Sequence, residues 1–148
     1  MAVYIIVGLV VVAGLILAYR SIGRPATQIV DPLAVLRAVL DAAIAASAAD
    51  SHDASHGARH RIEACAQQLE TIDASSLDEA GDDARAKLAV AVDELIWWTR
   101  LSERGAQSPS PGIQRAAGAL HEDALHCLDG AGRALASSEA AKVRERSV

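Results

Sequence analysis

The sequence predicts an all-α protein, in which one N-terminal transmembrane helix precedes a small antiparallel bundle of about four helices. Three observations predict this fold: a long uncharged apolar stretch opens the chain, alanine makes up roughly a fifth of the 148 residues, and apolar residues recur at helical spacing. Nothing in the pattern favours strands, since no alternating apolar and polar run occurs and Asp129-Gly130 lies inside a helical pattern.

Residues 1–20 are expected to form a membrane anchor. No charge occurs between Val3 and Tyr19, and a helix over this stretch would span about 26 Å at roughly 1.5 Å per residue. Tyr4 and Tyr19 stand near its two ends, where aromatic rings favour the level of the lipid headgroups. No basic residue precedes the stretch and no small-residue cleavage site ends it, so we expect a retained anchor rather than a signal peptide. The alternative is a buried core helix.

The basic residues beside this stretch predict its orientation. Arg20 and Arg24 follow it directly and none precedes it, which favours an outside N-terminus and a cytoplasmic C-terminal domain. The lack of Asn and the excess of Arg over Lys suggest a bacterial source, so we expect the membrane to be a bacterial inner membrane. Gly14 and Ala18 are four residues apart, a spacing at which small residues can seat another membrane helix. Residues 21–30 read as a short linker that keeps the following domain close to the membrane surface.

Residues 31–136 are expected to form the cytoplasmic bundle, and residues 137–148 a flexible polar tail. Capping and breaking residues predict the four helices: one from the Asp31 cap and Pro32 to about Ala49, one from about Asp53 to Ile72, one from the capping box Ser76–Glu79 to just before Gly105, and one from Ser110-Pro111.

Two of these helices carry more apolar surface than one core face requires. The first presents Val35 and Val39 opposite its main leucine stripe, with Arg37 and Asp41 expected to form an ion pair between the two faces. The third presents three large side chains opposite its core side: Val90, Trp97 and Leu101. These helices lie centrally in the bundle, or Trp97 lies at the membrane interface, or the second faces of the helices dock another protein.

Histidine and acidic residues suggest a metal site only weakly. His52, His56 and His60 have a spacing that can align imidazoles, but Gly57 interrupts the helix between them. His121 and His126 are five residues apart and do not share a helix face, so they are expected at the surface or the edge of the core. We therefore assign no catalytic, cofactor-binding or metal-binding residue, and no cofactor.

Charge and cysteine content limit the partners. The net charge of −5 argues against nucleic acid, whose binding surfaces need clustered Lys and Arg. Cys65 and Cys127 fit no metal or redox spacing and are expected to be reduced core residues.

The layout of one anchor and one small helical domain resembles the small single-span accessory subunits of actinobacterial respiratory supercomplexes. This resemblance rests on architecture and composition across the whole chain, and it carries no residue roles with it. It implies a non-catalytic accessory or assembly subunit of an inner-membrane complex, whose partners are the lipid bilayer and other membrane-protein subunits. The alternative is a membrane-tethered sensor that binds a metal or small ligand, and self-association into a homo-oligomer is a further possibility.

Overall fold

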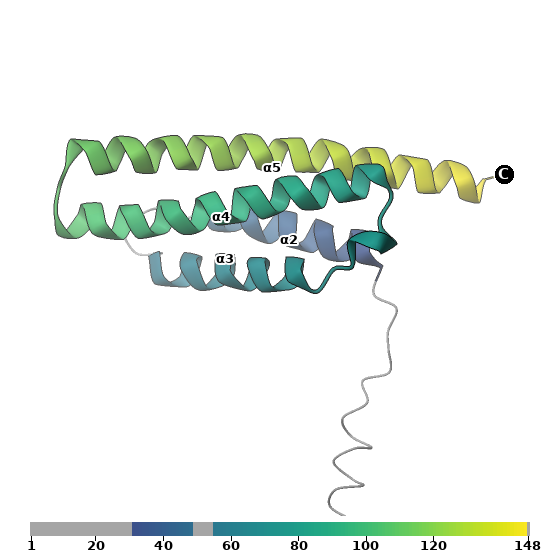
Figure 1. The fold of residues 1–148 in the computed structure, drawn as a ribbon, viewed down its shortest axis with the longest axis horizontal. Coiled ribbons are helices and arrows are strands. Elements are labelled where there is room, and N and C mark those ends of the chain that lie inside the picture. The colour runs from purple at the N-terminus through teal and green to yellow at the C-terminus, as the bar shows by residue number, and fades with distance from the viewer. Residues whose placement is uncertain (1–30, 49–54, 148) are drawn as a thin grey trace, which may run out of the picture. The chain divides into compact units, whose positions relative to one another are not determined.

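The structure, a computed structural model, describes residues 31–48 and 55–147. In these ranges the chain forms one compact unit of α2 (Pro32–Ser47), α3 (Ser55–Glu70), α4 (Glu79–Gln107) and α5 (Pro111–Arg146), with a 3₁₀ turn η1 (Ala74–Ser76) before α4 (Figure 1). The described ranges contain no strand, so the predicted all-α helical bundle is confirmed.

None of the helices in residues 31–48 and 55–147 is long and apolar enough to cross a membrane. The expected anchor (1–20) and linker (21–30) lie outside the described residues. With them lie the side chains expected to pack or anchor there, namely Tyr4, Gly14, Ala18, Tyr19, Arg20 and Arg24.

The two long helices, α4 and α5, form an antiparallel hairpin against which the two short helices pack (Figure 1). Contacts at both ends of α2 show that it also runs antiparallel to α5. Lys142 near the end of α5 lies 3.2 Å from the Asp31 carboxylate, and His121 lies 3.1 Å from the Ser47 carbonyl oxygen. The order of contacts therefore matches an antiparallel bundle joined by short connections.

Capping residues begin two of the helices, and one of the expected caps is wrong. Asp31 caps α2 as predicted, because its carboxylate accepts from the Leu33 N–H at 3.2 Å. Helix α4, however, is capped by Asp78 and not by Ser76. Ser76 belongs to η1, where its hydroxyl donates to the Asp73 carbonyl at 2.6 Å and is therefore not available to a helix N-terminus.

The ends of α4 and α5 lie further along the chain than the sequence predicts. Helix α4 passes through Gly105 and ends at Gln107, two residues before Pro109. Helix α5 continues to Arg146, so the expected flexible tail from residue 137 is wrong in its conformation. The reason is tertiary: Ser138 is completely buried, and Lys142 pairs with Asp31. Two contacts with other elements therefore hold this polar segment in the helix.

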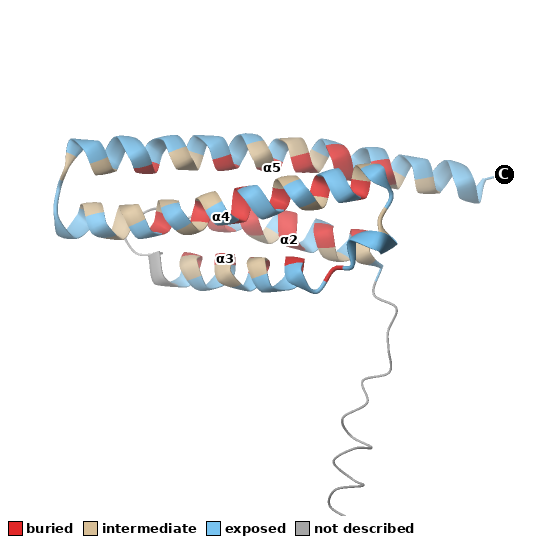
Figure 2. Ribbon diagram, viewed as in Figure 1, coloured by how far each residue is buried: buried red, intermediate tan, exposed pale blue. Residues whose placement is uncertain are grey.

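The core is thin and rich in alanine. Buried residues occupy the inward side of each helix, while the outward sides are exposed (Figure 2). Leu36, Ile62, Leu88, Leu95 and Leu135 are the largest side chains that are completely buried, and between them lie Ala43, Ala46, Ala84, Ala91, Ala124 and Ala131. Small side chains allow close helix packing but remove little apolar surface from water for each residue. Cys65 is buried in this core as expected, and Cys127 packs at its edge.

Helix α2 contacts all three other helices, which bury most of its apolar side chains but leave Ile44 exposed. Val39, expected on a partner-facing surface, is 0% exposed, and this expectation is wrong. Val35 is half-buried against the core. Arg37 and Asp41 stay exposed, and within the described part of the chain neither is in an ion pair, in contrast to the expected pairing.

Candidate functional site

The outward face of α4 carries two of the exposed large apolar side chains in the described residues. Val90 and Trp97 are seven residues apart, two helical turns, and each is 49% exposed. Leu101 lies one turn beyond Trp97 and is half-buried. Leu88 and Leu95, on the opposite side of the same helix, are completely buried. The sequence therefore predicted the exposure of Val90 and Trp97 correctly, although exposure alone identifies no partner.

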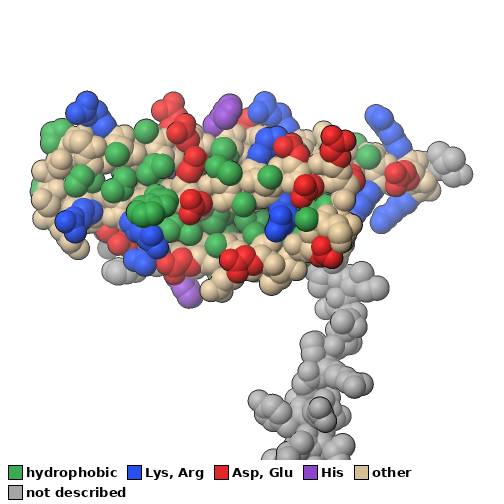
Figure 3. Space-filling view, in the orientation of Figure 1, with side chains coloured by type: hydrophobic (Ala, Val, Ile, Leu, Met, Phe, Trp, Pro, Cys, Tyr) green, Lys and Arg blue, Asp and Glu red, His purple; other side chains and the backbone are tan. Residues whose placement is uncertain are grey.

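Trp97 is held in position by its own helix. The Arg100 guanidinium carbon lies 5.0 Å from the centre of the indole ring, a cation–π contact worth about 0.5–1 kcal/mol at an exposed site. In the space-filling view, hydrophobic side chains form a band on one face of the bundle, with charged groups scattered along it (Figure 3). A large aromatic ring oriented in this way has the character of an interface anchor, because Trp and Arg are enriched at binding hot spots.

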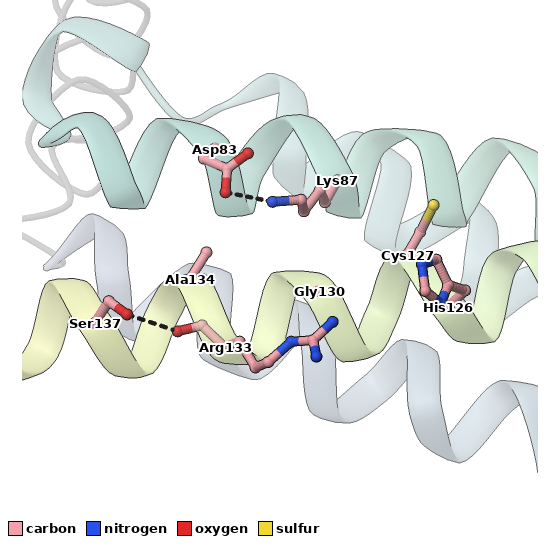
Figure 4. A pocket seen from close by; sticks show the side chains of 8 residues that line it. All are labelled: Asp83, Lys87, His126, Cys127, Gly130, Arg133, Ala134 and Ser137. Atoms are coloured by element: carbon pink, nitrogen blue, oxygen red, sulfur yellow. Dashed lines mark hydrogen bonds and ion pairs between the residues drawn. The ribbon is translucent and has the colours of Figure 1, made fainter.

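A groove of about 300 Å³ lies between α4 and α5 (Figure 4). Its polar groups are Asp83 and Lys87 from α4, with His126, Cys127, Arg133 and Ser137 from α5. Gly130 permits the close approach of Lys87, since a Cβ at this position would lie 3.2 Å from the lysine Cδ. Lys87 pairs with Asp83, and Arg133 pairs with Asp129. Both cations in the groove are thus already neutralised by an acid one turn away.

The ionisable groups beside this groove have raised pKa values. Burial raises the pKa of the Cys127 thiol, and the nearby carboxylates Glu94 and Asp123 raise it further. The pKa of Glu94 is itself raised, first by burial and then by Asp123 and Asp93, and its Oε2 is buried without a hydrogen-bond partner. Because the thiolate is the nucleophilic form of cysteine, a thiol with a raised pKa is a weak nucleophile.

His121, on α5, contacts residues of both α4 and α2. Its ring stacks on Trp98 of α4 with ring centres 4.5 Å apart and an interplanar angle of 21°, and its Nε2 lies 3.1 Å from the Ser47 carbonyl oxygen. His121 is partly buried, and its ring face and one nitrogen are engaged by protein groups. Its position is therefore explained by packing at the edge of the core.

The other histidines do not converge on a metal site in the described residues. His60 and His126 are exposed, on different helices. His52 and the side chain of His56 lie outside the described residues. Among the groups that the structure does describe, no cluster of three His, Cys, Asp or Glu side chains has the geometry to hold a metal ion.

Two other grooves are lined mainly by apolar side chains. The smaller, about 240 Å³, lies between α3 and α4 and is bordered by Glu70, Arg85 and Asp93. The larger, about 430 Å³, lies between α2 and α5 and contains Ile44 and Leu125, both substantially exposed. The sequence does not predict this second surface, because Ile44 continues the spacing of Leu36 and Leu40 along one side of its helix. Leu125 directly follows Ala124 and so lies to one side of the buried stripe formed by Ala124 and Leu128. This position in the sequence was the feature that could have predicted its exposure.

Comparisons with protein-family models, with curated proteins and with solved structures found no match to this chain.

Proposed function

We propose that this chain is a non-catalytic, membrane-anchored accessory or assembly subunit of a bacterial inner-membrane complex, with a respiratory complex as the first candidate. The observation that carries the proposal is the outward face of α4, where Val90 and Trp97 are each about half exposed on a bundle whose own core is thin. A partner that covers this face would add the buried apolar area that an alanine-rich core lacks.

The face has the composition of a docking site. Trp97 supplies a large, rigid ring, Arg100 lies against it, and Val90 and Leu101 extend the apolar surface along the helix in both directions. Interfaces of this kind depend on a few aromatic and arginine anchors surrounded by contacts of smaller energy. Val90, Trp97, Leu101 and the half-buried Val35 are the docking residues in this proposal, and Val39 is left out because it is buried.

The membrane part of the proposal rests on the sequence. The uncharged stretch of residues 1–20 would anchor the chain, with Tyr4 and Tyr19 at the two interfaces and Arg20 and Arg24 on the cytoplasmic side. Gly14 and Ala18 would pack against a neighbouring membrane helix. The described domain would then lie in the cytoplasm, close to the bilayer and within reach of other subunits.

Gentle detergent extraction from native membranes, followed by native gel separation and mass spectrometry, tests this function. We expect the chain to migrate in a large assembly with stoichiometric membrane-protein partners. Trp97→Asp should remove it from that assembly while leaving it in the membrane fraction, and Val90→Asp should have the same effect.

His60→Asp is the matched control, because it places the same charge at an exposed site on another helix. It should leave the assembly intact. A chain that migrates alone, or that keeps its partners in the Trp97→Asp variant, would contradict docking through α4. A chain that washes off membranes at alkaline pH would contradict the anchor instead.

A further inference from the structure

Four side chains form one stripe along the outward face of α4: Val90, Glu94, Trp97 and Leu101. They are spaced at i, i+4, i+7 and i+11, so they lie on one side of the helix over about 16 Å at roughly 1.5 Å per residue. Val90 and Trp97 are each 49% exposed, whereas Glu94 and Leu101 are partly buried. The apolar face proposed for docking therefore has a carboxylate near its centre.

The Glu94 carboxylate is not satisfied within the described part of the chain. Its Oε2 is buried without a hydrogen-bond partner, and the side chain forms no ion pair there. Burial raises the pKa of Glu94, Asp123 and Asp93 raise it further, and no basic side chain lowers it in return. An unpaired carboxylate beside two others destabilises the folded domain, so the stability of the domain does not explain why this residue is acidic.

The bases that α4 carries along the same side are engaged elsewhere. Lys87, two turns before Glu94, forms an ion pair with an aspartate of its own helix. Arg100 lies over the Trp97 ring. Arg104 lies in the last turn of the helix, where the helix dipole favours a positive charge. Within the described residues, α4 therefore supplies no base to Glu94.

A partner that covered this stripe with apolar side chains alone would remove Glu94 from water without compensation. Burying an unpaired carboxylate is strongly unfavourable, whereas a lysine or arginine placed against it offsets the loss of water. Because Glu94 is only partly buried, such a base can reach its carboxylate from the outward face. A second helix matches a straight stripe of this length, since helices pack through rows of side chains.

We infer that the docking partner is a helix of another subunit, which places a lysine or arginine against Glu94. Apolar side chains about one turn to either side of this base pack on Val90 and Trp97. Asp93 and Asp123, both exposed and close to Glu94, add to the attraction. Glu94 selects the partner by its charge, whereas the apolar side chains supply the buried area. The inference rests on the proposed function, docking through α4.

The native assembly in mild detergent tests this inference, with the fraction of the chain that stays in it measured on native gels over a dilution series. Glu94→Gln keeps the size of the side chain and removes its charge, so it should weaken association by about tenfold or more. Glu94→Lys should abolish association, because like charges would then meet. The glutamine variant is expected to be more stable than the unaltered chain at neutral pH, so its loss of association cannot be attributed to unfolding.

Glu122→Lys is the matched control, since Glu122 is exposed on α5 and forms no ion pair in the described residues. It should leave the assembly unchanged, and an equal loss in this variant would overturn the role of Glu94. If Trp97→Asp releases the chain but Glu94→Gln does not, docking through α4 stands and the basic partner is wrong. Tighter association of Glu94→Gln would also overturn it, because the carboxyl group would then be covered in its neutral form. If Trp97→Asp leaves the chain in place, the proposed docking fails, and the inference fails with it.

Discussion

The Ser138 hydroxyl lies 2.7 Å and 2.9 Å from the two carboxylate oxygens of Asp78, and it joins the last part of α5 to the first turn of α4. The same carboxylate accepts from the Gly81 N–H at 2.8 Å and so caps α4. One exposed aspartate therefore performs two tasks, one local and one between residues that are sixty positions apart. The donation from Ser138, followed by that from Gly81, lowers the pKa of Asp78.

Ser138→Ala should lower the free energy of unfolding by about 1 kcal/mol at neutral pH, because a part-buried hydrogen bond between distant segments is lost. The loss should shrink in acid. Since the folded-state pKa of Asp78 lies below the ordinary value of 3.8, its contribution is complete above that pH and disappears as the pH falls through the lowered value. Denaturation of both proteins at several pH values measures the difference.

Ser137→Ala is the control for that experiment. Ser137 is exposed and its hydroxyl donates only to the Arg133 carbonyl of its own helix, at 3.1 Å. Its removal should change stability little at any pH. An equal effect of the two serine variants would contradict the importance of the Asp78–Ser138 contact.

Two glycine-to-alanine substitutions should have opposite effects. At Gly81 a Cβ would lie 2.8 Å from the Asp78 Oδ1 and 3.2 Å from the Leu33 Cδ2, so Gly81→Ala should disturb the cap and cost about 1 kcal/mol. At Gly118, inside α5, nothing lies within 4 Å of the added atom. Gly118→Ala should therefore stabilise the protein by about 0.5–1 kcal/mol, the ordinary helix preference of alanine. Thermal unfolding of the two variants gives the comparison, and a gain in stability at Gly81 would refute the packing described there.

His121→Ala should cost about 1–2 kcal/mol, because it removes both the stack on Trp98 and the contact with the Ser47 carbonyl. A double-mutant cycle with Trp98→Ala should give a coupling energy of about 0.5–1.5 kcal/mol for the two rings. His126→Ala, at an exposed position five residues along, should be close to neutral. A coupling energy of zero would mean that the rings contact each other without stabilising the fold.

Glu94→Gln should stabilise the protein at neutral pH. Burial, with Asp123 and Asp93 nearby, raises the pKa of Glu94, so the folded state disfavours its charge. A raised folded-state pKa means that the contribution to stability is complete below the ordinary value of 4.5 and is lost as the pH rises through the raised value. The advantage of the neutral amide should therefore be present at pH 7 and shrink toward pH 4. Unfolding curves at the two pH values test this, and an advantage that grows in acid would reverse the assignment.

Helix content and most helix starts were predictable from local sequence. Asp31-Pro32 and Ser110-Pro111 both begin helices, and in each the proline removes one of the free N–H groups of the first turn. Asp31 also accepts from the Leu33 N–H, whereas the Ser110 side chain makes no capping hydrogen bond. The cap of α4 was not predictable in the same way. Ser76 and Asp78 both precede that helix, and the choice of Asp78 coincides with a contact to Ser138, which lies far away in the chain.

The exposed residues were likewise predictable on one helix and not on another. Helical spacing was sufficient to place Val90 and Trp97 opposite the core, because α4 has a single buried side. It was insufficient for α2, where both apolar faces are candidates. Contacts with three other helices bury Val39, and the open groove beside α5 leaves Ile44 exposed. No periodicity within α2 encodes which neighbour covers which face.

The sequence by itself determined that the described domain is all-helical, where most of its helices begin, and which side of α4 is apolar and exposed. These properties depend on interactions within a few residues, between a cap and the first turn or along one helix face. The tertiary structure alone decided that polar residues 137–146 continue α5, that Val39 is buried, and that Ile44 and Leu125 share a groove. The physical reason is that burial is a property of surfaces brought together from distant parts of the chain, and the local pattern offers several such surfaces without specifying their neighbours.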